Sequence, residues 1–147
     1  MEESIKSLVD QINHVFEVEK PDLRQYSGLA LAYIGDGIYD LVIRTLFVEK
    51  GNAPVNTFHK KTSKIVKAET QAQLVHAIEG EFSEEELSIY KRGRNAKSFT
   101  SAKNASVMDY RVATGFEALI GYLYLDNQME RILELIKSGL EKIGESI

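Results

Sequence analysis

The strongest constraint on the fold is a long apolar segment, LALAYIGDGIYDLVIRTLFVEK, that lies between Ser27 and Gly51. Serine is a preferred N-cap and glycine a preferred C-terminal stop, so the segment predicts one long helix that starts near Ser27 and ends at Gly51. Apolar residues occupy nearly every side of this helix. It is therefore predicted to be the central, buried helix of the fold.

Helical apolar spacing continues through the rest of the chain, and no pair of segments alternates as strands do. A first amphipathic helix extends from Ile5 to Phe16 and ends before Pro21, because proline disfavours helical geometry in the residue ahead of it. After the turn at Pro54, a third helix is predicted to extend through Val75. Its outer edge carries polar residues, namely Lys60, Lys64, Lys67 and Gln71.

The second half of the chain predicts three more helices. Ser83 and Glu86 form a capping-box pattern that opens a short helix through Tyr90. The following segment KRGRNAKSFTSAKN is rich in Gly, Asn and Ser and is expected to be a loop. A long helix begins near Asp109, which is expected to act as its cap, and a last helix carries apolar residues from Met129 to Ile143. The prediction is a single all-α domain over residues 1–147.

Composition excludes several kinds of chemistry. The chain has 147 residues and 0 Cys, so it holds no disulfide, thiolate zinc site, iron–sulfur cluster or cysteine nucleophile. The amino-terminal sequence MEESIKSLVDQ is acidic rather than basic and then apolar, and no apolar run approaches the roughly 20 residues that span a bilayer. A cytoplasmic protein with no membrane association is expected.

Basic residues are concentrated in two short segments although the net charge is -4. Five of the 18 basic residues lie between Lys50 and Lys67, five more lie between Lys91 and Asn104, and neither segment contains an acid. Arginine forks and lysines contact phosphates, although each segment alone also fits an ordinary solvated surface. Few aromatic residues are free to stack on single strands, so a duplex fits better. The candidate nucleic-acid contacts are His59, Lys60, Lys61, Lys64, Lys67, Arg92, Arg94, Asn95 and Lys97.

Two acids interrupt apolar helices beside small residues. Asp36 lies between two glycines in YIGDGI, and Glu117 lies in ATGFEALIG. A mid-helix glycine costs about 1 kcal/mol relative to alanine, and an unpaired buried carboxylate costs several kcal/mol more, so folding alone does not favour the pattern. Either the glycines clear space for a metal or substrate, or they form a close helix crossing with Asp36 paired to a base. If the helices pack together, Asp36 and Glu117 are expected to share a divalent cation. Asp40 is expected to face solvent or pair with Arg44.

From Gly28 to Leu125 the sequence resembles the ribonuclease III catalytic domain, and more closely its Mini-III branch. LALAYIGDGI resembles the signature helix, with Asp36 at the metal-binding aspartate, and TGFEALIG resembles the second acidic motif, with Glu117 at the metal-binding glutamate. KRGRNAK and His59-Lys60-Lys61 resemble segments characteristic of Mini-III. The sequence departs from full-length ribonuclease III at Leu29, Ala32 and Thr114, where acids are the rule, and it leaves no room for an appended double-stranded-RNA-binding domain.

The resemblance implies a homodimeric, Mg²⁺-dependent endoribonuclease that cuts double-stranded RNA to give 5′-phosphate and 3′-hydroxyl ends. Asp36 and Glu117 are its implied metal ligands and catalytic residues. The implied substrate is a base-paired stem in precursor 23S ribosomal RNA, with a ribosomal protein or a pre-ribosomal particle as a further partner. The alternative is a non-catalytic RNA-binding or ribosome-assembly module of the same fold, which the missing carboxylates at Ala32 and Thr114 favour.

Overall fold

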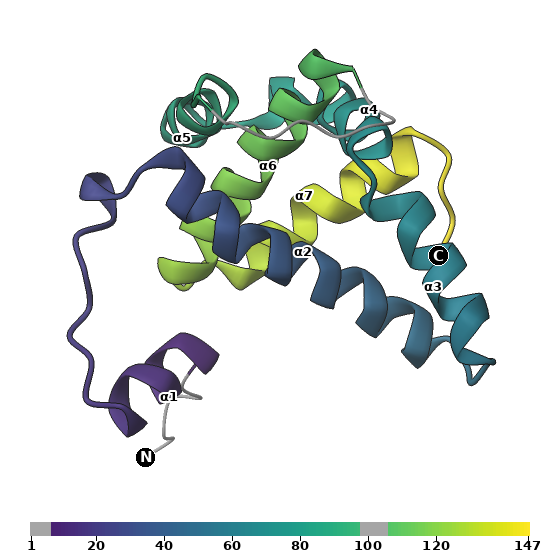
Figure 1. Cartoon of the computed structure of the whole chain (residues 1–147), viewed down its shortest axis with the longest axis horizontal. Helices are drawn as coiled ribbons and strands as arrows, with labels where there is room; N and C mark the ends of the chain where they lie inside the picture. Colours follow the sequence, from purple (N-terminus) through teal and green to yellow (C-terminus); the bar gives the residue numbers. More distant parts are fainter. Residues whose placement is uncertain (1–6, 98–105) are drawn as a thin grey trace.

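The computed structural model describes residues 7–97 and 106–147, and within these ranges the chain is helical with no strand. This confirms the expected all-α fold (Figure 1). The helices are α1 (Leu8–Val15), α2 (Gly28–Glu49), α3 (Val55–Val66), α4 (Ala68–Ile78), α5 (Glu84–Arg94), α6 (Val107–Leu125) and α7 (Met129–Lys142). Two short 3₁₀ turns, η1 (Leu23–Gln25) and η2 (Glu79–Glu81), lie between them. No described helix is long and apolar enough to cross a bilayer.

The centre of the fold is the crossing of α2 over α6 (Figure 1). Helices α4 and α5 also pack on α6, and α7 packs on α4. Two glycines allow the close approach. A Cβ atom on Gly35 would lie 1.7 Å from the backbone oxygen of Glu117, and one on Gly121 would lie 1.9 Å from the backbone oxygen of Leu31. The crossing is therefore a contact between two backbones, which no larger residue permits at these positions.

Helix α2 has the predicted ends but is not wholly buried. Ser27 caps it by accepting a hydrogen bond from the Ala30 amide, and the chain turns at Gly51 with φ of +144°. Its neighbours α3, α5 and α6 cover the side that carries Leu31 and Tyr39. The prediction of an enclosed helix is wrong for the rest of its surface, where Tyr33 is 85% exposed and Leu41 is 54% exposed.

The predicted third helix is in fact two helices that meet at Lys67. This residue has extended geometry, with φ -64° and ψ 152°, and it separates α3 from α4. Two side chains after the break bond to carbonyls before it: Thr70 Oγ1 donates to Lys64 O at 2.7 Å, and Gln71 Nε2 donates to Val66 O at 2.8 Å. The break turns Gln71 inward, with 2% of its surface exposed, so its predicted place on the outer lysine edge is wrong.

The predicted loop after Tyr90 begins later than expected, because α5 continues to Arg94. Gly93 does not provide flexibility there. It is buried, and a Cβ atom on it would lie 2.6 Å from Ala118 Cβ on α6, so the small residue serves helix packing. The capping box of Ser83 and Glu86 is present as predicted. Residues 98–105, which include the predicted contact segment's Lys103, lie outside the described residues.

The other helix ends follow local chemistry. Ser106, rather than Asp109, caps α6 by accepting the Asp109 amide hydrogen bond, so Asp109 is a first-turn acid and its predicted role as cap is wrong. Helix α1 is amphipathic as predicted, although only Val9 on it is buried and Phe16 just beyond it is 71% exposed. Ile5 lies outside the described residues.

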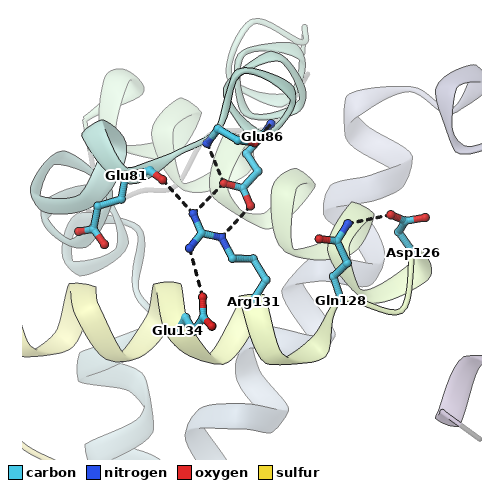
Figure 2. A network of polar contacts seen from close by, with 7 residues as sticks. Glu81, Glu86, Asp126, Gln128, Arg131 and Glu134 are labelled. Carbon is cyan, nitrogen blue, oxygen red and sulfur yellow. Dashed lines mark hydrogen bonds and ion pairs between the residues drawn. The ribbon is translucent and has the colours of Figure 1, made fainter. Parts of the chain in front are cut away.

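Arg131 joins α7 to the start of α5. Figure 2 shows its guanidinium between Glu86 and Glu134, with Glu81 alongside. It donates to both carboxylate oxygens of Glu86 at 2.8 and 2.9 Å, to the Glu81 carbonyl at 2.8 Å and to Glu134 at 3.2 Å. These hydrogen bonds lower the pKa of the Glu86 carboxyl. This bidentate ion pair holds the start of α5 against α7. Because α5 packs on α6, the ion pair also supports the position of α6.

Candidate active site

The two singled-out carboxylates meet at the glycine crossing. Asp36 follows Gly35 on α2, and Glu117 lies on α6 at the residue whose backbone contacts Gly35. Asp36 is exposed and Glu117 is half-buried. Their side chains form a hydrogen bond with each other. Two helices far apart in the sequence therefore bring two acids into direct contact at the surface of the bundle.

The close-crossing interpretation of the Gly-Asp-Gly pattern is right in part, and the metal or substrate interpretation stays a prediction. Gly35 makes the close helix crossing, whereas a Cβ atom on Gly37 would meet nothing within 4 Å. Within residues 7–97 and 106–147, no base forms an ion pair with Asp36. Asp40, one turn later, pairs with Arg44 at 2.6 Å as expected. The close-crossing interpretation required a basic side chain paired with Asp36, and the described residues include none. The partner of Asp36 is instead another acid, Glu117.

Three features of the site act on the Glu117 carboxyl and raise its pKa. Burial raises the pKa of the Glu117 carboxyl, the charge of Asp36 raises it further, and so does the hydrogen bond to Asp36, to about 8. A hydrogen bond from Gln71 opposes the shift. Burial likewise raises the pKa of the Tyr39 hydroxyl, and the charge of Glu117 adds to this. Two facing carboxylates in a partly buried site are unfavourable unless a proton or a cation lies between them.

Gln71 is the site residue that the sequence interpretation missed. From α4 its Nε2 atom donates to Glu117 Oε2 at 3.3 Å, in addition to Val66 O. The signal for its burial was present in the sequence. Position 71 falls between Ala68 and Val75 on the i, i+3, i+4, i+7 stripe that α4 buries, so a polar residue occupied a predicted core position.

The donor set suits a hard divalent cation. Mg²⁺ binds carboxylate oxygens and commonly keeps several waters, so one or two protein carboxylates are enough. Asp36 and Glu117 are such a pair, and no described cluster brings three or more His, Cys, Asp or Glu side chains together. A cation at this pair would replace the proton that the two acids share. The residues present therefore fit Mg²⁺ with a small number of protein ligands.

The basic residues of the first segment line α3 and its end. His59, Lys60, Lys61, Lys64 and Lys67 are all exposed. Lys61 lies 6.0 Å from the centre of the Phe47 ring, and Lys64 pairs with Glu145 at 3.4 Å. These two contacts are at the surface and contribute little to stability. Helix α3 thus presents a basic face on the molecule.

The basic residues of the second segment are tied more closely to the fold. Arg92 is half-buried and donates to the carbonyl of Tyr26 at 3.1 Å. Arg94 lies over the Tyr90 ring at 5.5 Å and donates to Asn95 at 3.3 Å. Lys97 is exposed. Arg92 therefore holds the residues that precede α2. Lys97 lies beyond the end of α5, just before residues 98–105.

Comparison with known proteins identifies the family. A family model described as the ribonuclease III domain matches residues 29–128, which include both acids and Gln71. The chain belongs to the ribonuclease III family. Within that family it belongs to the Mini-III branch, since it is similar to several proteins named Mini-ribonuclease 3. This membership supports an RNA endonuclease.

The similarity covers most of each relative. The Mini-ribonuclease 3 of Clostridium tetani is 50% identical over 88% of this chain and 87% of its own length. That of Enterococcus faecalis is 52% identical over 85% of this chain and 96% of its own length. A crystal structure of a Fusobacterium nucleatum protein superimposes with a TM-score of 0.74 at 36% identity, covering 80% of this chain and 95% of that one.

Two of the three positions where full-length ribonuclease III is expected to carry acids lie close to the pair, and neither holds an acid here. Ala32 lies one turn before Asp36 and is buried. Thr114 lies one turn before Glu117, and its hydroxyl donates to the Tyr110 carbonyl at 2.9 Å within α6. Neither side chain offers a carboxylate to the site. Among the described residues, the Asp36–Glu117 pair therefore has no third carboxylate beside it, and its ligand role remains a prediction.

The raised pKa of Glu117 predicts how stability depends on pH without metal. An unfolded glutamate ionises near its ordinary pKa of 4.5, while the folded one keeps its proton to about 8. Between these values the folded state binds more protons, so stability falls as pH rises, by at most ~1.4 kcal/mol per pH unit for one group. We expect Glu117→Gln, measured in EDTA, to lack this part of the decline. Parallel unfolding curves for the two proteins from pH 5 to 8 would contradict it.

Proposed function

We propose that the chain is a Mg²⁺-dependent endoribonuclease that cleaves double-stranded RNA and leaves 5′-phosphate and 3′-hydroxyl ends. The observation that carries the proposal is the contact of Asp36 with Glu117 where α2 crosses α6. Folding alone gains nothing from two acids in contact, since each disfavours the charge of the other. A site that binds a divalent cation accounts for both residues, and family membership supplies the class of reaction.

Each residue has a distinct part in this mechanism. Asp36, which is exposed, and Glu117, which is half-buried, would hold Mg²⁺ between them. The chemistry that a bound Mg²⁺ would supply is neutralisation of charge on the transition-state phosphate and a water of lowered pKa as the nucleophile. To serve as a ligand, Glu117 would have to release its proton to solvent. The backbone contact of Gly35 with Glu117 fixes the spacing of the two carboxylates before substrate arrives.

Recruitment of the duplex falls to the basic face of α3. Its lysines are exposed, which suits contacts to phosphates rather than to bases. The proposed contacts are His59, Lys60, Lys61, Lys64, Lys67, Arg92, Arg94, Asn95 and Lys97. Arg92 is a special case, because it already donates to Tyr26 O, so its replacement would disturb the start of α2 as well.

Two copies are needed to cut both strands of a duplex, and the exposed side of α2 supports a homodimer. Tyr33 and Leu41 there are large, apolar and uncovered, and Gly37 leaves open space between them. A twofold dimer buries the same face of both subunits. We expect sedimentation at micromolar concentration to give the mass of a dimer, and Tyr33→Glu to shift it towards monomer. A wild-type monomer that still makes paired cuts would contradict the dimer.

The natural substrate we propose is a base-paired stem of precursor 23S ribosomal RNA in the cytoplasm, met as free RNA or within a pre-ribosomal particle. The proposal rests on the resemblance to Mini-III. Incubation of the protein with this stem as a transcript should give one defined cut in each strand. A stem of equal length but unrelated sequence is the matched control, and equal cleavage of the two would contradict a preference for ribosomal RNA.

Cleavage with Mg²⁺ and with EDTA tests the function itself. We expect purified protein to cut duplex RNA with Mg²⁺ and to leave it intact with EDTA, and end-labelling should show 5′-phosphates on the products. The missing acids at Ala32 and Thr114 favour a second candidate, a non-catalytic RNA-binding module of the same fold. Binding of the duplex without any cleavage at saturating Mg²⁺ would support that module instead.

Charge removal on α3 tests the RNA-binding face. Lys60 and Lys67 form no hydrogen bond or ion pair that involves another described side chain, so Lys60→Gln with Lys67→Gln should leave the fold unchanged. Each lost phosphate contact removes about 0.9 from the slope of log affinity against log salt, so the double variant should lose nearly 2. The matched control is Lys137→Gln on α7, another exposed lysine. Equal slopes for both variants and the wild type would contradict a role of α3 in RNA binding.

A further inference from the structure

The buried amide of Gln71 is the polar group that neither the fold nor the two acids explain. Gln71 is 2% exposed and comes from α4, a third helix beside the α2–α6 crossing. Both of its amide hydrogens are used, one towards Val66 O at 2.8 Å and one towards Glu117 Oε2 at 3.3 Å. The Val66 carbonyl can accept a hydrogen bond only from the amide nitrogen of Gln71. This contact therefore fixes the orientation of the amide, with Nε2 also directed at Glu117.

The neighbouring residue shows what the helix break alone requires. Thr70 Oγ1 donates to Lys64 O, which closes one free carbonyl of α3 with a short, buried hydroxyl. Gln71 does the same for Val66 O, but with a longer side chain whose Oε1 atom has no partner among the described residues. An unpaired buried acceptor carries a cost in free energy. A shorter side chain such as that of Thr70 is enough to pair a carbonyl at the helix break. The longer amide of Gln71 makes an additional hydrogen bond, to Glu117.

From this geometry we infer that Gln71 is a positioning residue, which holds the Glu117 carboxylate in the orientation that binds the cation. The inference rests on the proposed function, since it assigns Gln71 a task in the same site. Glu117 is held from three directions: its backbone contacts Gly35, its carboxyl contacts Asp36, and its Oε2 accepts from Gln71. Groups of this kind, which bond to a ligand rather than to the metal, orient the ligand and commonly change metal affinity 10- to 100-fold when they are removed.

Two neighbouring substitutions separate positioning from support of the fold. Gln71→Met keeps the length of the side chain and removes both donors. Thr70→Val keeps the shape of its residue and removes the hydrogen bond to Lys64 O, with no contact to Glu117 lost. Both should lower the melting temperature, because each leaves a carbonyl of α3 unpaired. Calorimetric titration of the full chain with Mg²⁺ or Mn²⁺ alone, without RNA, measures the affinity of the site directly.

We expect Gln71→Met to bind the metal about tenfold or more weakly, and to need correspondingly more Mg²⁺ for half-maximal cleavage, while Thr70→Val stays within about twofold of wild type. If Gln71→Met does not fold, Gln71→Asn takes its place, because it keeps an amide but shortens the side chain. It should also bind the metal more weakly than wild type and Thr70→Val do. Wild-type affinity in the Gln71 variant, or equal losses in both variants, would overturn the positioning role alone. A wild-type protein that binds no metal would overturn the proposed function and this inference together.

Discussion

Replacement of Asp36 by Asn is expected to reduce duplex cleavage by roughly 10³-fold or more. The change removes the charge that would hold the proposed cation, while the volume of the side chain stays nearly constant. A metal contributes several kcal/mol of transition-state stabilisation, and each 1.4 kcal/mol is a factor of ten in rate. Glu117→Gln should behave alike. Both are measured as single-turnover cleavage at saturating Mg²⁺, with RNA binding followed separately by gel shift.

The matched control for Asp36→Asn is Asp40→Asn. Both aspartates lie on α2 one turn apart, but Asp40 pairs with Arg44 rather than with Glu117. Its replacement removes the same charge from the same helix, so it should change the rate by only a few-fold. Near-wild-type cleavage by Asp36→Asn, or an equal loss in both variants, would rule out the assigned role of Asp36.

Gly35→Ala should be among the most destabilising single substitutions in the chain. The new Cβ atom would lie 1.7 Å from the backbone oxygen of Glu117, and a backbone clash cannot be relieved by turning a side chain. Overpacking costs 1–3 kcal/mol and sometimes more, so we expect about 3 kcal/mol, or a melting temperature lower by roughly 6–12 °C. Forcing α2 and α6 apart should also weaken Mg²⁺ binding.

Gly37→Ala provides the opposite result from the same helix. Its Cβ atom meets nothing within 4 Å, so the protein should gain about 0.5–1 kcal/mol from the better helix former. Thermal unfolding of both variants checks the pair. Loss of stability in both would show that glycine is needed on α2 for a reason other than the crossing.

The sequence predicted the helices best where one local signal decided the outcome. Ser27 and the Ser83–Glu86 capping box started helices at the expected residues, because a cap depends only on residues next to it. The meeting of Asp36 and Glu117 was also expected, on the condition that their helices pack together. The two helices pack together because Gly35 and Gly121 allow their backbones to approach. The sequence shows that these residues are small, but it does not show which residues they contact.

The errors arose where tertiary contacts overrode a continuing helical pattern. At Lys67 the apolar spacing continues, but Thr70 and Gln71 pair with the carbonyls before the break, and no periodicity records that. Gly93 suggested a loop, whereas its value lies in contact with Ala118. The exposed Tyr33 face of α2 could not be separated from core by composition, since a partner subunit and a core favour the same residues.

The glycine crossing also limits how this site can change. Where ligand spacing depends on rotamers, a single substitution can widen or tighten a metal site, but here the distance between the helices that carry the two proposed ligands is set by backbone atoms. Ion selectivity is therefore hard to adjust at Asp36 or Glu117. The adjustable positions are those around them, Ala32 one turn along α2 and Thr114 one turn along α6, where a new acid would add a ligand without moving either helix. Alternative metal preferences in similar chains are thus expected to arise through residues that bind no metal in this one.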